Sequence, residues 1–364
     1  MEISSDDLIY NRFDIIYPNE YEEYKEMYKE KEYIIQMHLD NHVAELNLWG
    51  RNIPDDVVEH AMSYWENTYP DIYYFKITRA LDNIRGALVK GNEYILDLTD
   101  KNELMNRLKG KERHNIKYNL RQISKNGKLI ITNTSNIPEY LIEEFFKLKK
   151  ISHGTEYNLT PYEYIKKYHV TNTMYMVVQS GDKQILIAVL FYCKVKATVY
   201  FENFSYNQEF AKYSPGFLIY IEFLKELQKA GVNTVYLGGG DYYYKKKFNS
   251  LQRECYSGEI FTKEGYAKIK KILNNRNIAL YGMGNVGKSV LYQLNGININ
   301  VQFCIDKKGI EKNDKIGCYK ADEEWPICDL IIITIKNKIS EVENLIKARG
   351  YAYLYWSELI ESIR

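Results

Sequence analysis

The sequence predicts a mixed α/β protein with two sheets, a larger mixed sheet followed by a small parallel one. Two observations support this fold class. Between residues 174 and 237, three successive strand-like segments precede one amphipathic helix and a further strand. After residue 277, short apolar segments alternate with helical ones, which is the order of elements in a parallel sheet. A Gly-x-Gly-x-x-Gly turn follows the first of these apolar segments.

Length and composition set the class of protein. The chain has 364 residues, of which 45% are hydrophobic and 27% charged, ordinary values for a globular protein of two or three domains. The net charge of +1 gives no overall electrostatic reason to expect a nucleic acid or membrane partner. None of the five cysteines lies in a Cys-x-x-Cys pair, and no apolar run approaches the roughly 18 residues of a membrane span. We therefore expect a cytoplasmic protein, and its many Tyr, Asn, Ile and Lys residues indicate an AT-rich bacterial genome.

Residues 1–91 are expected to form a helical or mixed front part of the first domain. The composition of Tyr21–Tyr33 and the apolar pattern of Ile53–Thr68 favour helices. Tyr94–Leu98 resembles a short strand. No pattern in this region indicates a catalytic or binding site.

A basic segment follows at Lys101–Lys128, with nine Lys and Arg against two Glu. Arg113, Lys117 and Arg121 recur every fourth residue and would line one face of a helix. Such a face either binds an anionic substrate or phosphate groups, or is simply solvated. RNA binding is a weaker alternative, because no aromatic residues of a recognisable module are interleaved.

The segment Tyr213–Asn249 carries the clearest pattern. Ser214 is a typical N-cap residue and Pro215 a typical first helical residue. Apolar residues then recur at helical spacing until Gly231 ends the helix, and a strand follows over Val232–Leu237. The start of a helix has unpaired N–H groups that suit an anion. An ordinary helix–strand unit of an α/β sheet is the alternative.

The order Tyr-Ser-Pro-Gly, helix, Gly, strand, Gly-Gly-Asp and Tyr-Lys resembles the GNAT superfamily of acyltransferases. The pattern is most similar to the cellulose-biosynthesis-type acetyltransferases, which are related to Fem-type aminoacyl transferases. The resemblance implies a GNAT-like core with a mixed central sheet over residues 92–262, and acetyl-CoA or another acyl-CoA as donor. Ser-Pro-Gly stands where the superfamily commonly has Arg/Gln-x-x-Gly-x-Gly/Ala. The residues that carry the resemblance are Tyr213, Ser214, Pro215, Gly216, Gly231, Gly240, Asp241, Tyr244 and Lys245.

The resemblance also implies roles for individual residues. An attacking amine must lose a proton, for which Asp241 is the first candidate base and Glu202 the second. Tyr244 would protonate the leaving thiolate, and backbone N–H groups near Phe204 or Tyr206 would bind the thioester oxygen. Structural alternatives stay open, since Asp241 also suits a helix cap and the lysines after Tyr244 a solvated turn. The residues expected to bind CoA are Tyr213, Ser214, Gly216 and Lys245, and those expected to bind the acceptor are Arg113, Lys117, Arg121 and Tyr206.

The glycine turn after residue 281 has the features of a dinucleotide fingerprint. Gly282 permits a tight turn, Gly284 the approach of a pyrophosphate, and Gly287 close packing of helix on strand. Asp306 follows at the position that would hold a ribose. The same glycines fit a P-loop, which we reject because about 90 residues are too few for the usual P-loop core.

After a linker at residues 263–276, residues 277–364 resemble the small Rossmann-like modules of surface-polysaccharide enzymes. The resemblance rests on Tyr-Gly-Met-Gly-Asn-Val-Gly, the strand that ends at Asp306, Gly317, and Asp-Leu-Ile-Ile-Ile-Thr-Ile. It implies a site for a nucleotide, NAD or a nucleotide-sugar, and a purely structural role is the alternative.

These features predict an N-acyltransferase that acylates an amine on a sugar, nucleotide-sugar or glycan precursor. One alternative is a Fem-type aminoacyl transferase that uses charged tRNA. Another is a non-catalytic nucleotide sensor that regulates a partner. A dehydrogenase ranks last, because no Tyr-x-x-x-Lys pair or catalytic companion domain is visible. A homo-oligomer is compatible with the sequence.

Overall fold

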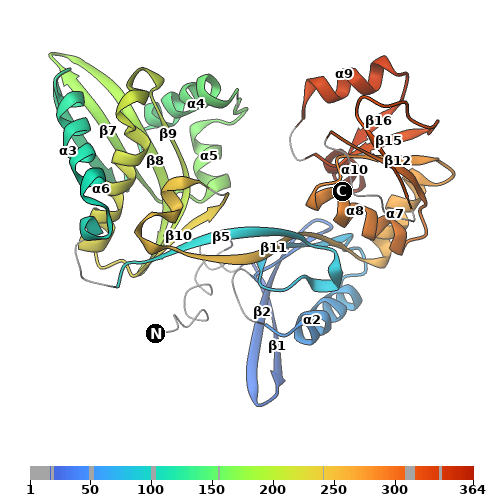
Figure 1. Cartoon of the computed structure of the whole chain (residues 1–364). Helices are drawn as coiled ribbons and strands as arrows, with labels where there is room; N and C mark the ends of the chain where they lie inside the picture. The colour runs from blue at the N-terminus through green and yellow to red at the C-terminus, as the bar shows by residue number, and fades with distance from the viewer. Residues whose placement is uncertain are drawn as a thin grey trace. The chain divides into compact units, whose positions relative to one another are not determined.

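The structure is a computed structural model, and it describes residues 17, 20–48, 53–99, 104–154, 156–240, 242–307, 316–335 and 338–364. Two compact units make up the chain: one combines Met1–Gly91 with Cys255–Arg364, and the other is Asn92–Glu254 (Figure 1). No helix among the described residues is long and apolar enough to cross a membrane.

The sheet of the Asn92–Glu254 unit has the strand order β5-β10-β9-β8-β7-β6. Strands β6 to β9 form an antiparallel meander, whereas β10 pairs in parallel with β9 and antiparallel with β5. Gly181, with φ +60°, lies in the hairpin turn between β7 and β8. The strands are β5 (Val89–Asp97), β6 (Lys128–Thr134), β7 (Asn172–Ser180), β8 (Lys183–Val195), β9 (Thr198–Tyr206) and β10 (Thr234–Gly239).

Four α-helices cover the two faces of this sheet. Helices α3 and α6 share one buried apolar cluster with the sheet, and α4 and α5 share another on the opposite face (Figure 1). The 3-10 turns η2 (Leu104–Arg107), η3 (Gln208–Tyr213) and η4 (Tyr243–Asn249) connect these elements. The helices are α3 (Gly110–Ser124), α4 (Glu139–His153), α5 (Pro161–Tyr168) and α6 (Pro215–Lys229).

Helix α6 has the predicted limits. Pro215 is its first residue, and Gly231, with φ +71°, follows its end. Val232 N–H donates to Leu227 O at 3.0 Å and closes the last turn. Ser214 occupies the N-cap position, but its hydroxyl makes no cap hydrogen bond. Its left-handed backbone, with φ 53°, differs from the extended conformation that lets an N-cap side chain reach the helix amides.

In the described residues, the front part of the other unit contains five strands and the helix α2 (Asp55–Thr68). Its strand order is β1-β2-β3-β4-β11, and α2 packs on the sheet as predicted for Ile53–Thr68. The helix expected at Tyr21–Tyr33 is wrong, because this segment forms β1 and the start of β2. The side chains of β1 alternate in burial with a period of two, and Lys29 and Glu30 turn the chain with positive φ. The strands are β1 (Glu22–Tyr28), β2 (Lys31–Asp40), β3 (Val43–Leu46), β4 (Tyr74–Ala80) and β11 (Leu251–Phe261), and η1 is Ile84–Gly86.

The same unit ends in a separate parallel sheet of five strands, in the order β14-β13-β12-β15-β16. All its strand pairs are parallel, so the predicted fold class is confirmed. Residues 263–276, expected to be a linker, contain α7, whose Ile269 and Leu273 are buried in the core of this unit. The strands are β12 (Ile278–Tyr281), β13 (Val301–Asp306), β14 (Gly317–Lys320), β15 (Leu330–Ile333) and β16 (Tyr353–Tyr355). The helices are α7 (Lys263–Leu273), α8 (Asn285–Gly296), α9 (Ser340–Ala348) and α10 (Trp356–Ile363).

Two glycines of the turn between β12 and α8 differ sharply in their surroundings. A Cβ at Gly287 would lie 2.0 Å from Gly282 O, whereas a Cβ at Gly284 would meet nothing within 4 Å. We expect Gly287→Ala to lower the free energy of unfolding by about 1–3 kcal/mol or more. Gly284→Ala should stay within about 0.5 kcal/mol of wild type. Urea denaturation of the two variants checks this contrast, and equal stabilities would contradict it.

Candidate active site

Strands β9 and β10 are neighbours over only part of their length. Residues 198–200 pair with residues 234–236, and the rings of Tyr200 and Tyr236 stack at 5.1 Å at the last shared pair. Beyond that point β9 pairs with β8, and β10 pairs with β5 at Gly238 and Gly239. In the described ladder, the facing edges of β9 and β10 therefore have no partner strand after Tyr200 and Tyr236.

Glu202 is the extra residue of a β-bulge in this free part of β9. Asn203 lies opposite Phe191 and Phe201 opposite Tyr192, so that no residue of β8 is paired with Glu202. A bulge turns the strand locally and redirects side chains out of the regular alternation. The sequence predicts Glu202 as a candidate base but not the bulge, because the bulge depends on pairing with β8.

Backbone N–H groups near the bulge face the open edge of β9. Asn207 N–H donates to Ile187 O at 2.9 Å, and antiparallel alternation then directs the N–H groups of Phe204 and Tyr206 away from β8. Phe204 N–H donates to the side chain of Asn203 at 3.0 Å. Of the two amides predicted as oxyanion donors, that of Tyr206 is therefore the better placed to bind a ligand oxygen.

The start of α6 lies directly beside the same strand. A Cβ at Gly216 would lie 2.9 Å from the ring of Phe204 and 3.1 Å from that of Tyr206, so only glycine fits without a shift of these rings. Phe217 N–H and Leu218 N–H both donate to Ser214 O, whereas Gly216 N–H makes no backbone hydrogen bond in the described part of the chain. An amide at the positive end of a helix, together with the exposed Ser214, is suited to an anion.

Tyr244 reaches this region from η4. Its ring lies 5.0 Å from Tyr220 on α6 and 5.6 Å from Phe204 on β9, measured between ring centroids. Burial raises the pKa of the Tyr244 phenol well above its ordinary value, and the neighbouring Tyr242 adds to the rise. The phenol therefore keeps its proton at neutral pH, as a proton donor must.

Lys245, the next residue, has a different environment from the one the sequence suggested. Its side chain is buried, and its ammonium donates to the carbonyls of Gly238 and Gly239 at the end of β10. The ring of Tyr242 lies 5.4 Å away. Through these contacts Lys245 stabilises the end of β10. A contact between Lys245 and the phosphates of CoA stays a prediction. Asp241 lies outside the described residues.

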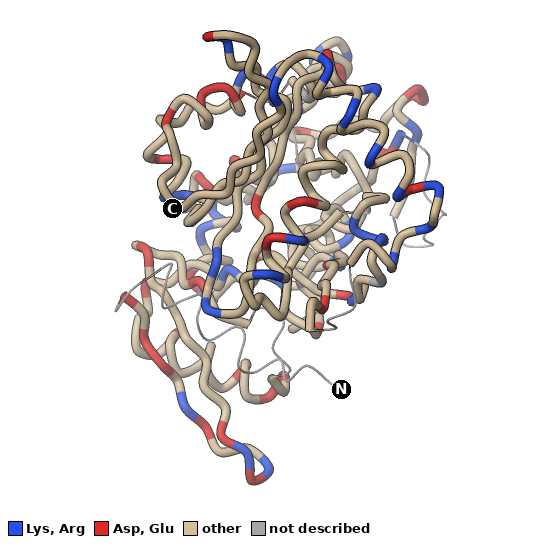
Figure 2. The backbone as a smooth tube through the Cα atoms, turned by 90° about the vertical axis from the view of Figure 1, so that its left-hand side faces the viewer, with Lys and Arg blue, Asp and Glu red and all other residues tan. Residues whose placement is uncertain are grey.

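The basic face of α3 is only partly exposed. Arg113 donates to Met105 O at 3.3 Å and to Leu108 O at 2.8 Å, so its guanidinium holds η2 in place. Lys117 and Arg121 are exposed. Elsewhere Lys and Arg are interspersed with Asp and Glu along the backbone (Figure 2), in keeping with the net charge of +1.

Residues 110–246 match the family model of the acetyltransferase (GNAT) domain. The chain therefore contains a GNAT domain. The match supports the acyltransferase activity that the sequence predicts. No curated protein sequence matches the chain.

Solved structures resemble the chain in fold only. A crystal structure of FemX has 8% identity and a TM-score of 0.50, covering 73% of this chain and 94% of that one. The C-terminal domain of a putative lysylphosphatidylglycerol synthetase from Agrobacterium fabrum has 11% identity and a TM-score of 0.43, with coverages of 74% and 97%. A tandem GNAT protein from the clavulanic acid biosynthesis pathway has 10% identity and a TM-score of 0.38, with coverages of 62% and 78%.

The other face of the GNAT domain holds residues that the sequence did not single out. Tyr157 accepts a hydrogen bond from Asn203 Nδ2 at 3.2 Å, which fixes the residue after the bulge. The hydroxyl of Tyr164 is buried and has no hydrogen-bond partner among the described residues. Burial and then the charge of Glu202 raise the pKa of the Tyr168 phenol.

In the parallel sheet, the glycine turn is compact. Helix α8 begins at Asn285, directly after Gly284, and Met283 N–H donates to Asp306 Oδ2 at 2.8 Å. The Ser289 hydroxyl is buried and donates to Ala87 O, so it is unlike the metal-binding serine of a P-loop. Gly284 is exposed and its Cβ position is open, as a close approach of phosphate requires.

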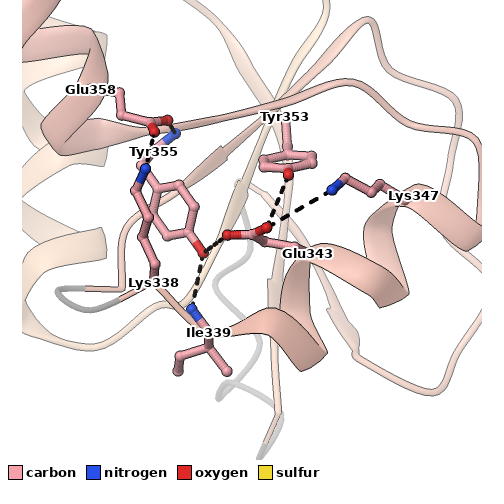
Figure 3. Close-up of polar contacts among 7 residues, drawn as sticks. All are labelled: Lys338, Ile339, Glu343, Lys347, Tyr353, Tyr355 and Glu358. Atoms are coloured by element: carbon pink, nitrogen blue, oxygen red, sulfur yellow. Dashed lines mark hydrogen bonds and ion pairs between the residues drawn. The ribbon is translucent and has the colours of Figure 1, made fainter. Parts of the chain in front are cut away.

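A polar network joins α9 to β16 and to the start of α10 (Figure 3). Glu343 on α9 accepts hydrogen bonds from the hydroxyls of Tyr353 and Tyr355 at 3.2 and 3.0 Å. The Tyr355 hydroxyl in turn accepts from Ile339 N–H at 3.1 Å, at the start of α9. These groups satisfy one another and hold α9 against β16. The remaining members, which form ion pairs around this centre, are Lys338, Lys347 and Glu358.

Proposed function

We propose that the protein transfers an acyl group from acyl-CoA, acetyl-CoA in the first place, to an amine on a sugar, nucleotide-sugar or glycan precursor. The observation that carries the proposal is the separation of β9 from β10 beside the start of α6. In this arrangement Tyr206 N–H would donate to the thioester end of a bound donor, and the helix start at Gly216 to its phosphate end. In the proposal, the helix start at Ser214 and Gly216 contacts the phosphates of CoA, with Tyr213 beside it.

The chemistry of this proposal divides among three groups. The Glu202 carboxylate takes the proton of the attacking amine, and Asp241, the first candidate from the sequence, is the alternative base. The amine nitrogen attacks the thioester carbon, and Tyr206 N–H donates to the thioester oxygen as it gains charge. The carbon–sulfur bond of the tetrahedral intermediate then breaks and releases the thiolate of CoA. Tyr244 gives its phenolic proton to the leaving sulfur. Lys117 and Arg121 contribute to acceptor binding.

Binding of acetyl-CoA tests the proposal. A donor present at 100 times its Kd should add about 2.7 kcal/mol to the stability of the wild type. Ser214→Asp places a negative charge at the helix start, in a backbone conformation that Asp tolerates, and should abolish the shift by repelling phosphate. Gly284→Asp, in the parallel sheet, should retain it. No shift with wild type, or a shift lost only in Gly284→Asp, would contradict the proposal.

For the parallel sheet we propose binding of a nucleotide, NAD or nucleotide-sugar at the turn between β12 and α8. The open position at Gly284 and the carboxylate of Asp306 support it. Thermal shifts with NAD, ATP and UDP-sugars are expected to respond to at least one ligand and to lose that response in Gly284→Asp. A response to none of them would leave the sheet with a structural role.

Transfer of an aminoacyl group from charged tRNA is the alternative favoured by the exposed Lys117 and Arg121. Under this alternative, Lys117→Glu with Arg121→Glu would weaken tRNA binding, and the wild-type affinity would fall steeply with salt. Filter binding with total tRNA separates the two proposals, because an acyl-CoA enzyme should show no such specific complex. A nucleotide sensor would bind ligands and transfer no group.

A further inference from the structure

Helix α4 carries three lysines close together, and one of them has a different environment. Lys147 pairs with Glu144 at 2.6 Å, and Lys150 pairs with Glu156 at 2.7 Å. Both ammonium groups are exposed to solvent. Lys149 is partly buried and has no carboxylate partner within the part of the chain that the structure describes.

The side chain of Lys149 lies in an aromatic environment next to the bulged strand. Its Nζ is 5.6 Å from the centre of the Phe145 ring and 5.9 Å from that of the Phe204 ring. Phe145 belongs to the buried cluster beneath α4 and α5, whereas Phe204 follows the bulge in β9. Burial lowers the pKa of Lys149, because the charged amine loses hydration there. The ring faces compensate only part of this loss.

A partly desolvated ammonium without a counter-ion is suited to binding an anion. Because Lys149 contacts the strand that carries Glu202 and Tyr206, an anion bound there would belong to a molecule that reacts at the bulge. We propose that Lys149 binds a phosphate or carboxylate group carried by the acceptor amine. This inference rests on the proposed function and narrows the acceptor to amines that also bear a negative charge.

The experiment compares acceptors in pairs that differ by one anionic group: glucosamine with glucosamine 6-phosphate, and L-alaninamide with L-alanine. Binding is measured by thermal shift, and transfer by release of CoA thiol from acetyl-CoA. The variants are Lys149→Met, which keeps the apolar length of the side chain, Lys149→Arg, which keeps the charge, and Lys147→Met as the matched control on α4.

Wild type and Lys147→Met are expected to bind the anionic member of one pair about tenfold or more tightly than its neutral counterpart, the effect of one charged hydrogen bond. Lys149→Met should lose this preference, and Lys149→Arg should keep most of it. The pair that shows the preference distinguishes phosphate from carboxylate.

A preference that survives in Lys149→Met, or no preference in wild type for either pair, would overturn the inference. The two measurements also separate it from the proposed function. A Lys149-dependent preference in binding without any thiol release would support the anion site and contradict acyl transfer. Thiol release that is equal for both members of each pair would support transfer and contradict the anion site.

Discussion

Replacing Glu202 by glutamine is expected to lower kcat for acyl transfer by about 10²- to 10⁴-fold, the usual contribution of a general base. Glutamine has nearly the same shape but cannot accept the proton of the attacking amine. Since the proposal assigns CoA binding to the start of α6 and not to the bulge that carries Glu202, the KM for acetyl-CoA should change little. Steady-state release of CoA thiol measures both constants, with whichever acceptor the paired comparison of glucosamine and alanine derivatives identifies as the best substrate.

Two further variants sharpen this test. Glu209 is exposed in η3, so Glu209→Gln should keep wild-type activity. Asp241→Asn examines the other candidate base. If Glu202→Gln keeps its kcat while Asp241→Asn loses activity, the base is Asp241 and the role given to the bulge is wrong.

Removing the buried carboxylate of Glu93 is expected to lower the free energy of unfolding by about 3–5 kcal/mol. The Glu93 side chain is fully buried in β5, where its carboxylate accepts a hydrogen bond from Arg253 Nε on β11. The Arg253 guanidinium also lies 6.0 Å from the ring of Tyr236. Glu93→Ala leaves this guanidinium in a largely buried position without its carboxylate. Urea denaturation of wild type and Glu93→Ala gives the difference.

An exposed ion pair provides the matched control. Glu226 and Lys229 pair at 2.8 Å on the surface of α6, and Glu226→Ala should cost only about 0–1 kcal/mol. In the double variant Glu93→Leu with Arg253→Met, much of the lost stability should return, because no buried charge is left over. A cost for Glu93→Ala no larger than that of Glu226→Ala would show that burial of the pair has no energetic effect.

Much of the fold follows from local sequence patterns. The helical spacing of apolar residues, with Pro215 at one end and Gly231 at the other, gave the limits of α6. The alternation of apolar and helical segments after residue 277 gave the parallel sheet, and Gly287 packs on the turn as its position in the glycine pattern implies. These features depend on residues close together in the chain, so they are visible without a structure.

Other features depend on partners far along the chain. The tyrosines and charged residues of Tyr21–Tyr33 suit either a helix or a hairpin, and pairing with β2 and packing on α2 decide for the hairpin. Likewise the bulge at Glu202 arises from the register with β8, and the burial of Lys245 from the carbonyls at the end of β10.

The sequence by itself thus determined which elements form and which residue types stand near the candidate site. Only the tertiary structure decided which of those residues face one another and which charges lose water. Lys147, Lys149 and Lys150 illustrate the difference, since the sequence shows three similar lysines on one helix. Desolvation is set by the surrounding aromatic side chains and strands, which come from distant parts of the chain, and it singles out Lys149.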